Sequence, residues 1–162
     1  MKQLIWYGLV LVGLLVVISV VTPAPSPDGA AVKQVSSILS SEEAQYDFGN
    51  VSMANGLVTH EYQVSNNSDQ PILIDKMFTS CMCTEAELAI DGKVYGSFGM
   101  PGHGLMARQI ATLAPGQTAT VTAKFDPAAH GPAGVGMVDR MVTLVDADGG
   151  SLDLGFKAMV TP

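Results

Sequence analysis

The chain has 162 residues, which is enough for one domain and a short additional segment. It is acidic, with 15 Asp and Glu residues against 8 Lys and Arg and a formal net charge of −7 at pH 7. It contains no cluster of basic residues, so nucleic acid is not expected as a partner.

The first segment is an unbroken apolar run, Leu4–Val21. As a helix it would be about 27 Å long, close to the thickness of a bilayer's hydrocarbon core. Lys2 precedes the run and the next basic residue is Lys33, so the positive-inside rule places the N-terminus in the cytoplasm and the rest outside. We expect residues 1–22 to be an uncleaved anchor in the cytoplasmic membrane. A cleaved signal sequence, which would make the protein an exported one, is the alternative.

Residues 23–42 are the expected spacer between this anchor and the domain. Residues 22–29 read Thr-Pro-Ala-Pro-Ser-Pro-Asp-Gly, and the repeated proline predicts an extended, stiff segment. Residues 30–43 combine helical spacing of apolar residues with many serines. They predict either a marginal helix or a lead-in to the first strand.

From residue 43 onward the pattern is that of β-strands. Apolar and polar residues alternate in short runs, and Asn, Ser, Gly and Pro separate the runs. Asp148-Gly149-Gly150 predicts a hairpin. The expected strands are 46–51, 58–64, 72–78, 118–125, 140–145 and 152–160. Several short strands without a long helix predict an all-β sandwich over residues 43–162.

Residues 85–110 interrupt this alternating strand pattern. The segment contains Gly92, Gly96, Gly99, Gly102, Gly104 and Pro101. It is too long for a hairpin loop, so we expect an ordered excursion that carries function.

Five motifs occur in order along this part of the chain. They are Tyr-Asp-Phe-Gly-Asn-Val at 46–51, Val-Ser-Asn-Asn-Ser-Asp-Gln-Pro-Ile at 64–72, Thr-Ser-Cys-Met-Cys-Thr at 79–84, Leu-Ala-Pro-Gly at 113–116 and Phe-Asp-Pro at 125–127. Together they resemble the bacterial domain-of-unknown-function family 1573. The resemblance covers about residues 43–162. It implies an immunoglobulin-like β-sandwich, related to Hydin and abnormal-spindle domains, in an exported and often anchored protein without an established activity.

The chain departs from that family's pattern in two places. Met82 stands where the usual Cys-Gly-Cys-Thr motif has glycine, and the segment 85–110 looks longer than the family's short link. Both departures could mark a subgroup with its own site.

Cys81 and Cys83 are the two cysteines of the chain, so within a monomer each can pair only with the other. If this stretch is extended, both sulfurs project from one face of the strand. There they could hold a soft metal such as Cu(I) or Zn(II). Met100 and His103, in the glycine-rich segment, are the candidates for further ligands. A thioether among the ligands favours copper over zinc.

Two other interpretations of the cysteines stay open. They could form a strained local disulfide or a thiol–disulfide redox pair, or pack as small inert hydrophobic residues. A redox thiol needs a low pKa, and the sequence places no basic residue beside the pair, Lys76 being the nearest cation. His60, on an expected strand, and His130, in a turn, are weaker ligand candidates.

The sequence therefore predicts an anchored extracytoplasmic module for binding or scaffolding rather than an enzyme. Its candidate cofactor is copper or zinc at Cys81, Cys83, His103 and Met100. A thiol–disulfide redox protein and a purely structural envelope protein are the alternatives.

Overall fold

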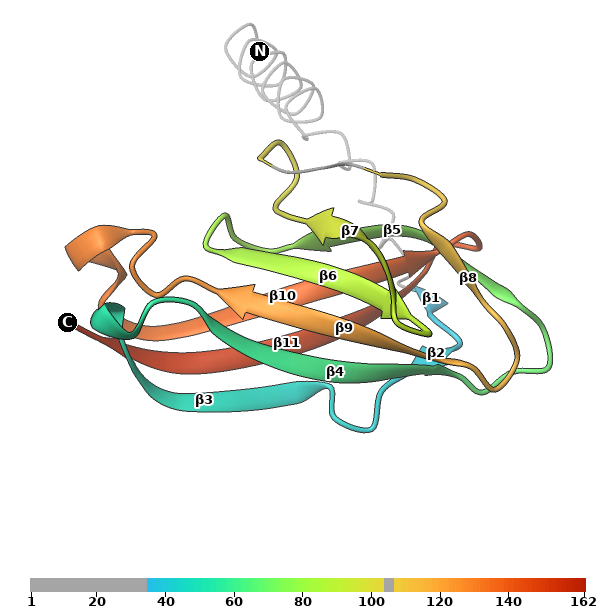
Figure 1. Ribbon diagram of the computed structural model, residues 1–162, viewed down its shortest axis with the longest axis horizontal. Helices are drawn as coiled ribbons and strands as arrows, with labels where there is room; N and C mark the ends of the chain where they lie inside the picture. Colours follow the sequence, from blue (N-terminus) through green and yellow to red (C-terminus); the bar gives the residue numbers. More distant parts are fainter. Residues whose placement is uncertain (1–34, 104–106) are drawn as a thin grey trace, which may run out of the picture. The chain divides into compact units, whose positions relative to one another are not determined.

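Two β-sheets packed face to face make up the computed structural model, which describes residues 35–103 and 107–162 (Figure 1). The expected all-β sandwich is confirmed. Within the described ranges, no helix combines the length and the apolar character needed to cross a membrane. The expected anchor, Leu4–Val21, lies outside these ranges.

The first sheet has the strand order β1-β11-β10-β5-β8, with β3 also paired to β11. β1 and β3 run parallel to β11, and the other pairs are antiparallel. Its strands are β1 (Val35–Ser36), β3 (Gln45–Ser52), β5 (Ile72–Thr79), β8 (Ala111–Leu113), β10 (Gly136–Asp146) and β11 (Gly150–Thr161).

The second sheet is antiparallel throughout, with the order β2-β4-β9-β6-β7. Its strands are β2 (Leu39–Ser40), β4 (Val58–Asn66), β6 (Thr84–Ile90), β7 (Lys93–Phe98) and β9 (Thr118–Phe125). Two short 3-10 turns, η1 (Met53–Asn55) and η2 (Gly131–Gly134), lie in the links β3–β4 and β9–β10.

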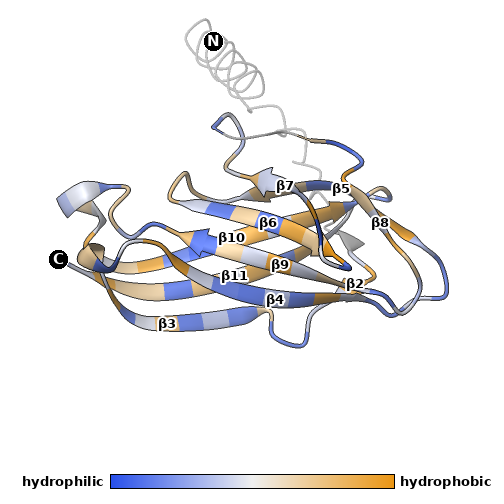
Figure 2. Cartoon of the chain, viewed as in Figure 1, coloured by the Kyte–Doolittle hydropathy of each residue, from blue (hydrophilic) through white to orange (hydrophobic). Residues whose placement is uncertain are grey.

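Alternation of apolar and polar residues along the strands builds the core between the sheets (Figure 2). Each fully buried aliphatic or aromatic side chain contributes about 1.5–3 kcal/mol relative to exposure. The hydroxyl of buried Tyr62, on β4, donates to the carbonyl oxygen of Gly155, on β11, at 2.7 Å, which joins the two sheets by a hydrogen bond. The largest fully buried side chains include Tyr62, Phe98, Phe156, Ile74, Leu88, Leu113, Leu144 and Leu154.

The six strands expected from the sequence are confirmed, since each lies inside an observed strand. The described part of residues 30–43 forms the short strands β1 and β2 and no helix, so it is a lead-in to the sandwich.

The expectation of one long excursion over residues 85–110 is wrong. β6 and β7 occupy most of it as a hairpin, which turns at Asp91 and Gly92 with φ angles of 50° and 79°. Buried and less buried residues alternate along β6 as in a strand at the core. An Asp-Gly pair between apolar runs is a strong hairpin signal, and the many glycines of this segment obscured it.

Asn66, at the end of β4, links the β4–β5 turn to the end of β8 through side-chain hydrogen bonds. Its side chain is fully buried. Its Nδ2 donates to the carbonyl oxygens of Gln70 at 2.8 Å and Leu113 at 2.9 Å. Its Oδ1 accepts from the amide of Ser68 at 3.0 Å and from the Ser68 hydroxyl at 2.7 Å. The geometry of the β4–β5 turn and its attachment to β8 therefore depend on one amide group.

We expect Asn66→Ala to lower the free energy of unfolding by about 1–3 kcal/mol, because it leaves the buried carbonyl oxygen of Leu113 without this donor. Equilibrium denaturation of the purified protein measures this loss. The matched control is Asn67→Ala, which removes an exposed amide bonded to the Ser40 hydroxyl. That change should stay within about 0.5 kcal/mol. Equal effects of the two substitutions would contradict the role given to Asn66.

Candidate functional site

Cys81 and Cys83 lie where the chain crosses from one sheet to the other. β5 belongs to the first sheet and β6 to the second, so residues 80–83 span the sandwich at one end (Figure 1). The stretch is a turn, closed by a hydrogen bond from the Thr84 amide to the Cys81 carbonyl oxygen at 3.1 Å. The extended conformation considered from the sequence is not the one observed. A turn, rather than the two-residue repeat of a strand, brings the two sulfurs together.

Buried threonines hold the backbone of this turn. Thr79 and Thr84 are both 1% exposed. The Thr79 hydroxyl contacts the carbonyl oxygens of Cys81 at 3.0 Å and Thr84 at 2.9 Å. The Asp126 amide, from the link after β9, donates to the Cys83 carbonyl oxygen at 2.9 Å. The positions of the two cysteines are therefore determined by contacts with both sheets.

His130 reaches the cysteines from the link between β9 and β10, which lies at the same end of the sandwich, on the left in Figure 1. The link is compact. Asp126 Oδ1 accepts from the Ala128 amide at 2.9 Å, and the Gly131 amide donates to the Ala128 carbonyl oxygen at 2.8 Å. Gly134 packs closely on the histidine, since a Cβ atom there would lie 3.2 Å from the His130 Cβ.

The three side chains form one group of soft donors. Cys81 Sγ lies 2.7 Å from Cys83 Sγ and 3.3 Å from His130 Nε2, and one ligand atom from each residue lies within 4.8 Å of the others. No disulfide joins the two cysteines in this structure. Cys83 is buried, Cys81 is half-buried and His130 is exposed, so the group opens to solvent at the histidine. Two thiols and an imidazole are a donor set suited to a soft metal.

Arg140, on β10, stands beside this group. Its Nε donates to Cys83 Sγ at 3.3 Å, and its Nη1 donates to the Asp139 carbonyl oxygen at 2.8 Å. The inference that no basic residue neighbours the cysteines is therefore wrong. Arg140 is 57 residues away from Cys83 in the chain, and the sandwich brings them together.

The two thiols differ in acidity. Burial raises the pKa of Cys81, but hydrogen bonds from the thiol and amide of Cys83 and from His130, with the charge of Arg140, outweigh it and lower the pKa to about 7. Burial and the hydrogen bond with Cys81 raise the pKa of Cys83. As the pH rises, Cys81 is thus the thiol of the pair that ionises first, and Cys83 is the thiol that donates to it.

Of the two further ligands expected from the sequence, His103 is absent from this group of histidine and cysteine side chains. His103, in the segment after β7, is replaced there by His130. Met100 and His103 instead line a separate hollow of about 190 Å³, together with Met82. From the sequence, His130 was a weaker ligand candidate located in a turn. Its role depends on two links meeting at one end of the fold, which local sequence does not encode.

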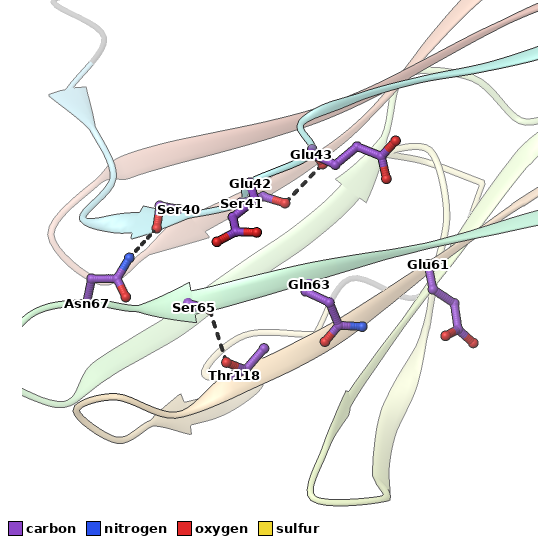
Figure 3. Close-up of a pocket in the computed structure, with 9 residues that line it drawn as sticks. All are labelled: Ser40, Ser41, Glu42, Glu43, Glu61, Gln63, Ser65, Asn67 and Thr118. Carbon is purple, nitrogen blue, oxygen red and sulfur yellow. Dashed lines mark hydrogen bonds between the residues drawn. The ribbon is translucent and has the colours of Figure 1, made fainter.

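A larger hollow of about 520 Å³ lies over β4 and β9, away from the cysteines (Figure 3). Two pairs of its polar side chains bond with one another. Asn67 Nδ2 donates to Ser40 Oγ at 2.7 Å, and the hydroxyls of Ser65 and Thr118 lie 3.0 Å apart. The lining, which holds neither a sulfur nor an imidazole, consists of Ser40, Ser41, Glu42, Glu43, Glu61, Gln63, Ser65, Asn67 and Thr118. The larger hollow is therefore not the one with soft donors.

The two sheets and their topology define an immunoglobulin-like β-sandwich that carries a thiol–imidazole group at one end. The family model described as Protein of unknown function (DUF1573) matches residues 39–93, which confirms the resemblance seen in the motifs. The matched stretch contains both cysteines but neither His130 nor Arg140. No curated protein matches the chain.

The chain is similar to several solved structures at low sequence identity. A protein of unknown function from Porphyromonas gingivalis W83 is similar with a TM-score of 0.54 and 12% identity, over 82% of this chain and 51% of that one. The secreted serine protease VesC from Vibrio cholerae is similar with a TM-score of 0.49 and 15% identity, over 76% of this chain and 24% of that one. The ASH / PapD-like domain 7 of human CEP192 is similar with a TM-score of 0.46 and 12% identity, over 87% of this chain and 95% of that domain. The chain thus spans about half or less of the first two.

The difference in acidity predicts a difference in reactivity between the thiols. In the reduced protein, alkylation of Cys81 by iodoacetamide should rise with pH and reach half its maximal rate near pH 7, because the thiolate is the nucleophile. Cys83 should react more slowly and only at higher pH. Tandem mass spectrometry of the peptide that contains both residues separates the two rates. Equal rates with a common midpoint near the ordinary pKa of about 8.5 would contradict this assignment.

Proposed function

We propose that this protein is an extracytoplasmic binding module that holds a Cu(I) ion on Cys81, Cys83 and His130. The observation that carries the proposal is the convergence of three soft donors, from two links far apart in the chain, within 4.8 Å of one another. Thiolates are ligands that select Cu(I), and imidazole is compatible with it. The exposed imidazole gives an incoming ion access to the buried sulfur.

The number of donors favours Cu(I) over Zn(II). Structural zinc sites take four ligands in nearly all cases. Among the described residues this group supplies three from histidine, cysteine and acidic side chains. Cu(I) is satisfied by fewer soft ligands.

Charge favours Cu(I) as well. Two thiolates and one Cu(I) carry a net negative charge, which the guanidinium of Arg140 offsets at 3.3 Å from Cys83 Sγ. Two thiolates and one Zn(II) carry no net charge, so Arg140 has no negative charge to compensate at a zinc site.

Loading the metal requires the sulfurs to separate. They are 2.7 Å apart, whereas two sulfurs that each lie ~2.3 Å from one metal ion are ~4 Å apart. Cys81 is half-buried and Cys83 is buried, so Cys81 has the greater freedom to turn.

The location outside the cytoplasm is part of the same proposal. It is supported by the apolar run Leu4–Val21, which follows Lys2 and precedes the rest of the chain. Thiols outside the cytoplasm face oxidising conditions, and a bound metal ion keeps them from forming disulfides. The cytoplasmic membrane is then the partner of this segment.

The N-terminus of the protein isolated from membranes tests the anchor. Intact mass should include residues 1–22, and the protein should resist extraction by alkaline carbonate. Leu14→Arg combined with Leu15→Arg should abolish membrane retention, because each arginine at a helix centre costs about 2.5–3.5 kcal/mol on the insertion scale. A mature chain that begins after residue 22 would support the cleaved signal instead.

We expect one equivalent of Cu(I) to protect both thiols from alkylation. Arg140→Gln should weaken Cu(I) binding by about 10–100-fold, as loss of a group that supports a ligand does, and His130→Ala by at least as much. Competition with a chromogenic Cu(I) chelator gives the affinities. His60→Ala, which removes a histidine outside the group, is the control and should leave them unchanged. Protection of the thiols by Zn(II) as good as by Cu(I), or full affinity in His130→Ala, would contradict the proposal.

A thiol–disulfide redox protein is the second candidate, favoured by the lowered pKa of Cys81 and its contact with Cys83. The Cys81 thiolate would attack a disulfide of a substrate protein and expel one substrate thiolate. Cys83 would then attack the mixed disulfide, release the second thiolate and leave a Cys81–Cys83 disulfide. Catalysis of insulin reduction in the presence of a reducing thiol tests this candidate. A rate of insulin reduction no higher than that of the Cys81→Ser variant would contradict the redox function.

A further inference from the structure

A second set of soft side chains lines a hollow on another side of the crossover turn. The hollow has a volume of about 190 Å³, and its lining includes Met82, Met100, His103 and Glu85. Met82 also lines the hollow next to Cys83, so it lies between the two sets of donors. Neither His103 nor Glu85 belongs to the thiol–imidazole group.

The fold holds the parts of this hollow together. Met82 lies in the turn between β5 and β6, whereas Met100 and His103 follow β7. The Thr79 amide donates to the carbonyl oxygen of Gly99 at 3.2 Å, which ties the segment after β7 to the end of β5. The His103 amide donates to the carbonyl oxygen of Met100 at 2.9 Å and closes a tight turn. Within that turn Gly102 has a φ of 86°, which glycine adopts without strain.

The exposure of Met82 is not explained by packing. It is 56% exposed, whereas Met77, five residues earlier, is 2% exposed in the core. A methionine in the core fills space and gains free energy from burial. A largely exposed thioether at the edge of a hollow gains little of this and keeps its sulfur available to a ligand.

The chemistry of the hollow fits a soft monovalent cation. Thioether sulfur and imidazole nitrogen are neutral donors that Cu(I) accepts, and thioether is not among the usual zinc ligands. Because such donors leave the charge of the ion uncompensated, a nearby carboxylate is favourable. Glu85 provides one, held at the hollow by a hydrogen bond from the Ser97 hydroxyl to its Oε2 at 3.2 Å.

We propose that Met82, Met100 and His103 form a second Cu(I) site, beside the thiolate site and distinct from it. The hollow gives it an environment of neutral donors with one carboxylate, where the first site has thiolates and a guanidinium. The second site needs neither cysteine, so it can be tested in a chain without thiols.

The test uses Ag(I), a redox-inert analogue of Cu(I), and full-length protein that carries Cys81→Ser and Cys83→Ser. Its methionine methyl groups are labelled with ¹³C. Saturable Ag(I) binding should shift the methyl signals of Met82 and Met100, and Zn(II) should shift neither. Met82→Leu and Met100→Leu, which keep the volume of the side chain, should each abolish saturable binding. The signal of buried Met77 reports whether each variant is folded.

Met137→Leu is the matched control, because Met137 is 66% exposed on β10 and lies outside the hollow. It should leave Ag(I) binding unchanged. Equal shifts at Met137 and Met82, or saturable binding that survives Met82→Leu, would overturn the second site. So would the absence of any shift in the folded protein. Because this chain lacks the thiols, these outcomes leave the cysteine site to be judged by its own experiment.

Discussion

The chain crosses from one sheet of the sandwich to the other within residues 80–83, and the candidate site depends on how that short crossing is held. The hydroxyl of buried Thr79 contacts the carbonyl oxygens on both sides of the turn. Ser80 bonds to the backbone of Met141 on β10 through its own amide and hydroxyl. Since this backbone is fastened to its neighbours, two cysteines separated by one residue present their sulfurs at the end of the sandwich.

At that end the fold gathers charge and donors from distant parts of the chain. Arg140 compensates negative charge on the sulfurs, and His130 opens the pair to solvent. Met82, between the cysteines, faces a different hollow with Met100 and His103. A single turn thus separates two environments, one of thiolates beside a guanidinium and one of neutral donors beside a carboxylate. We propose that both environments bind the same soft ion, Cu(I).

Local patterning was sufficient to predict six of the eleven strands in the described residues, because a strand such as Val58–Asn66 follows its own two-residue period. It failed at Asp91-Gly92, where a hairpin signal was obscured by the glycines that follow. The cysteines could be identified as a candidate site from their spacing. Their neighbours could not, since β10 and the β9–β10 link meet the turn only in the folded sandwich. Sequence reasoning therefore favoured His103, which is nearer in the chain, over His130.

X-ray absorption at the copper K-edge, on protein that carries Met82→Leu and Met100→Leu and is loaded with one equivalent of Cu(I), tests the central claim most directly. These two substitutions remove the proposed second site, whose His103 would otherwise supply an imidazole. The account predicts a first shell of two sulfurs and one imidazole nitrogen, with the imidazole signal lost in His130→Ala. A shell that keeps its imidazole signal in that variant, a shell of sulfur alone, or failure of the reduced protein to retain copper would contradict it.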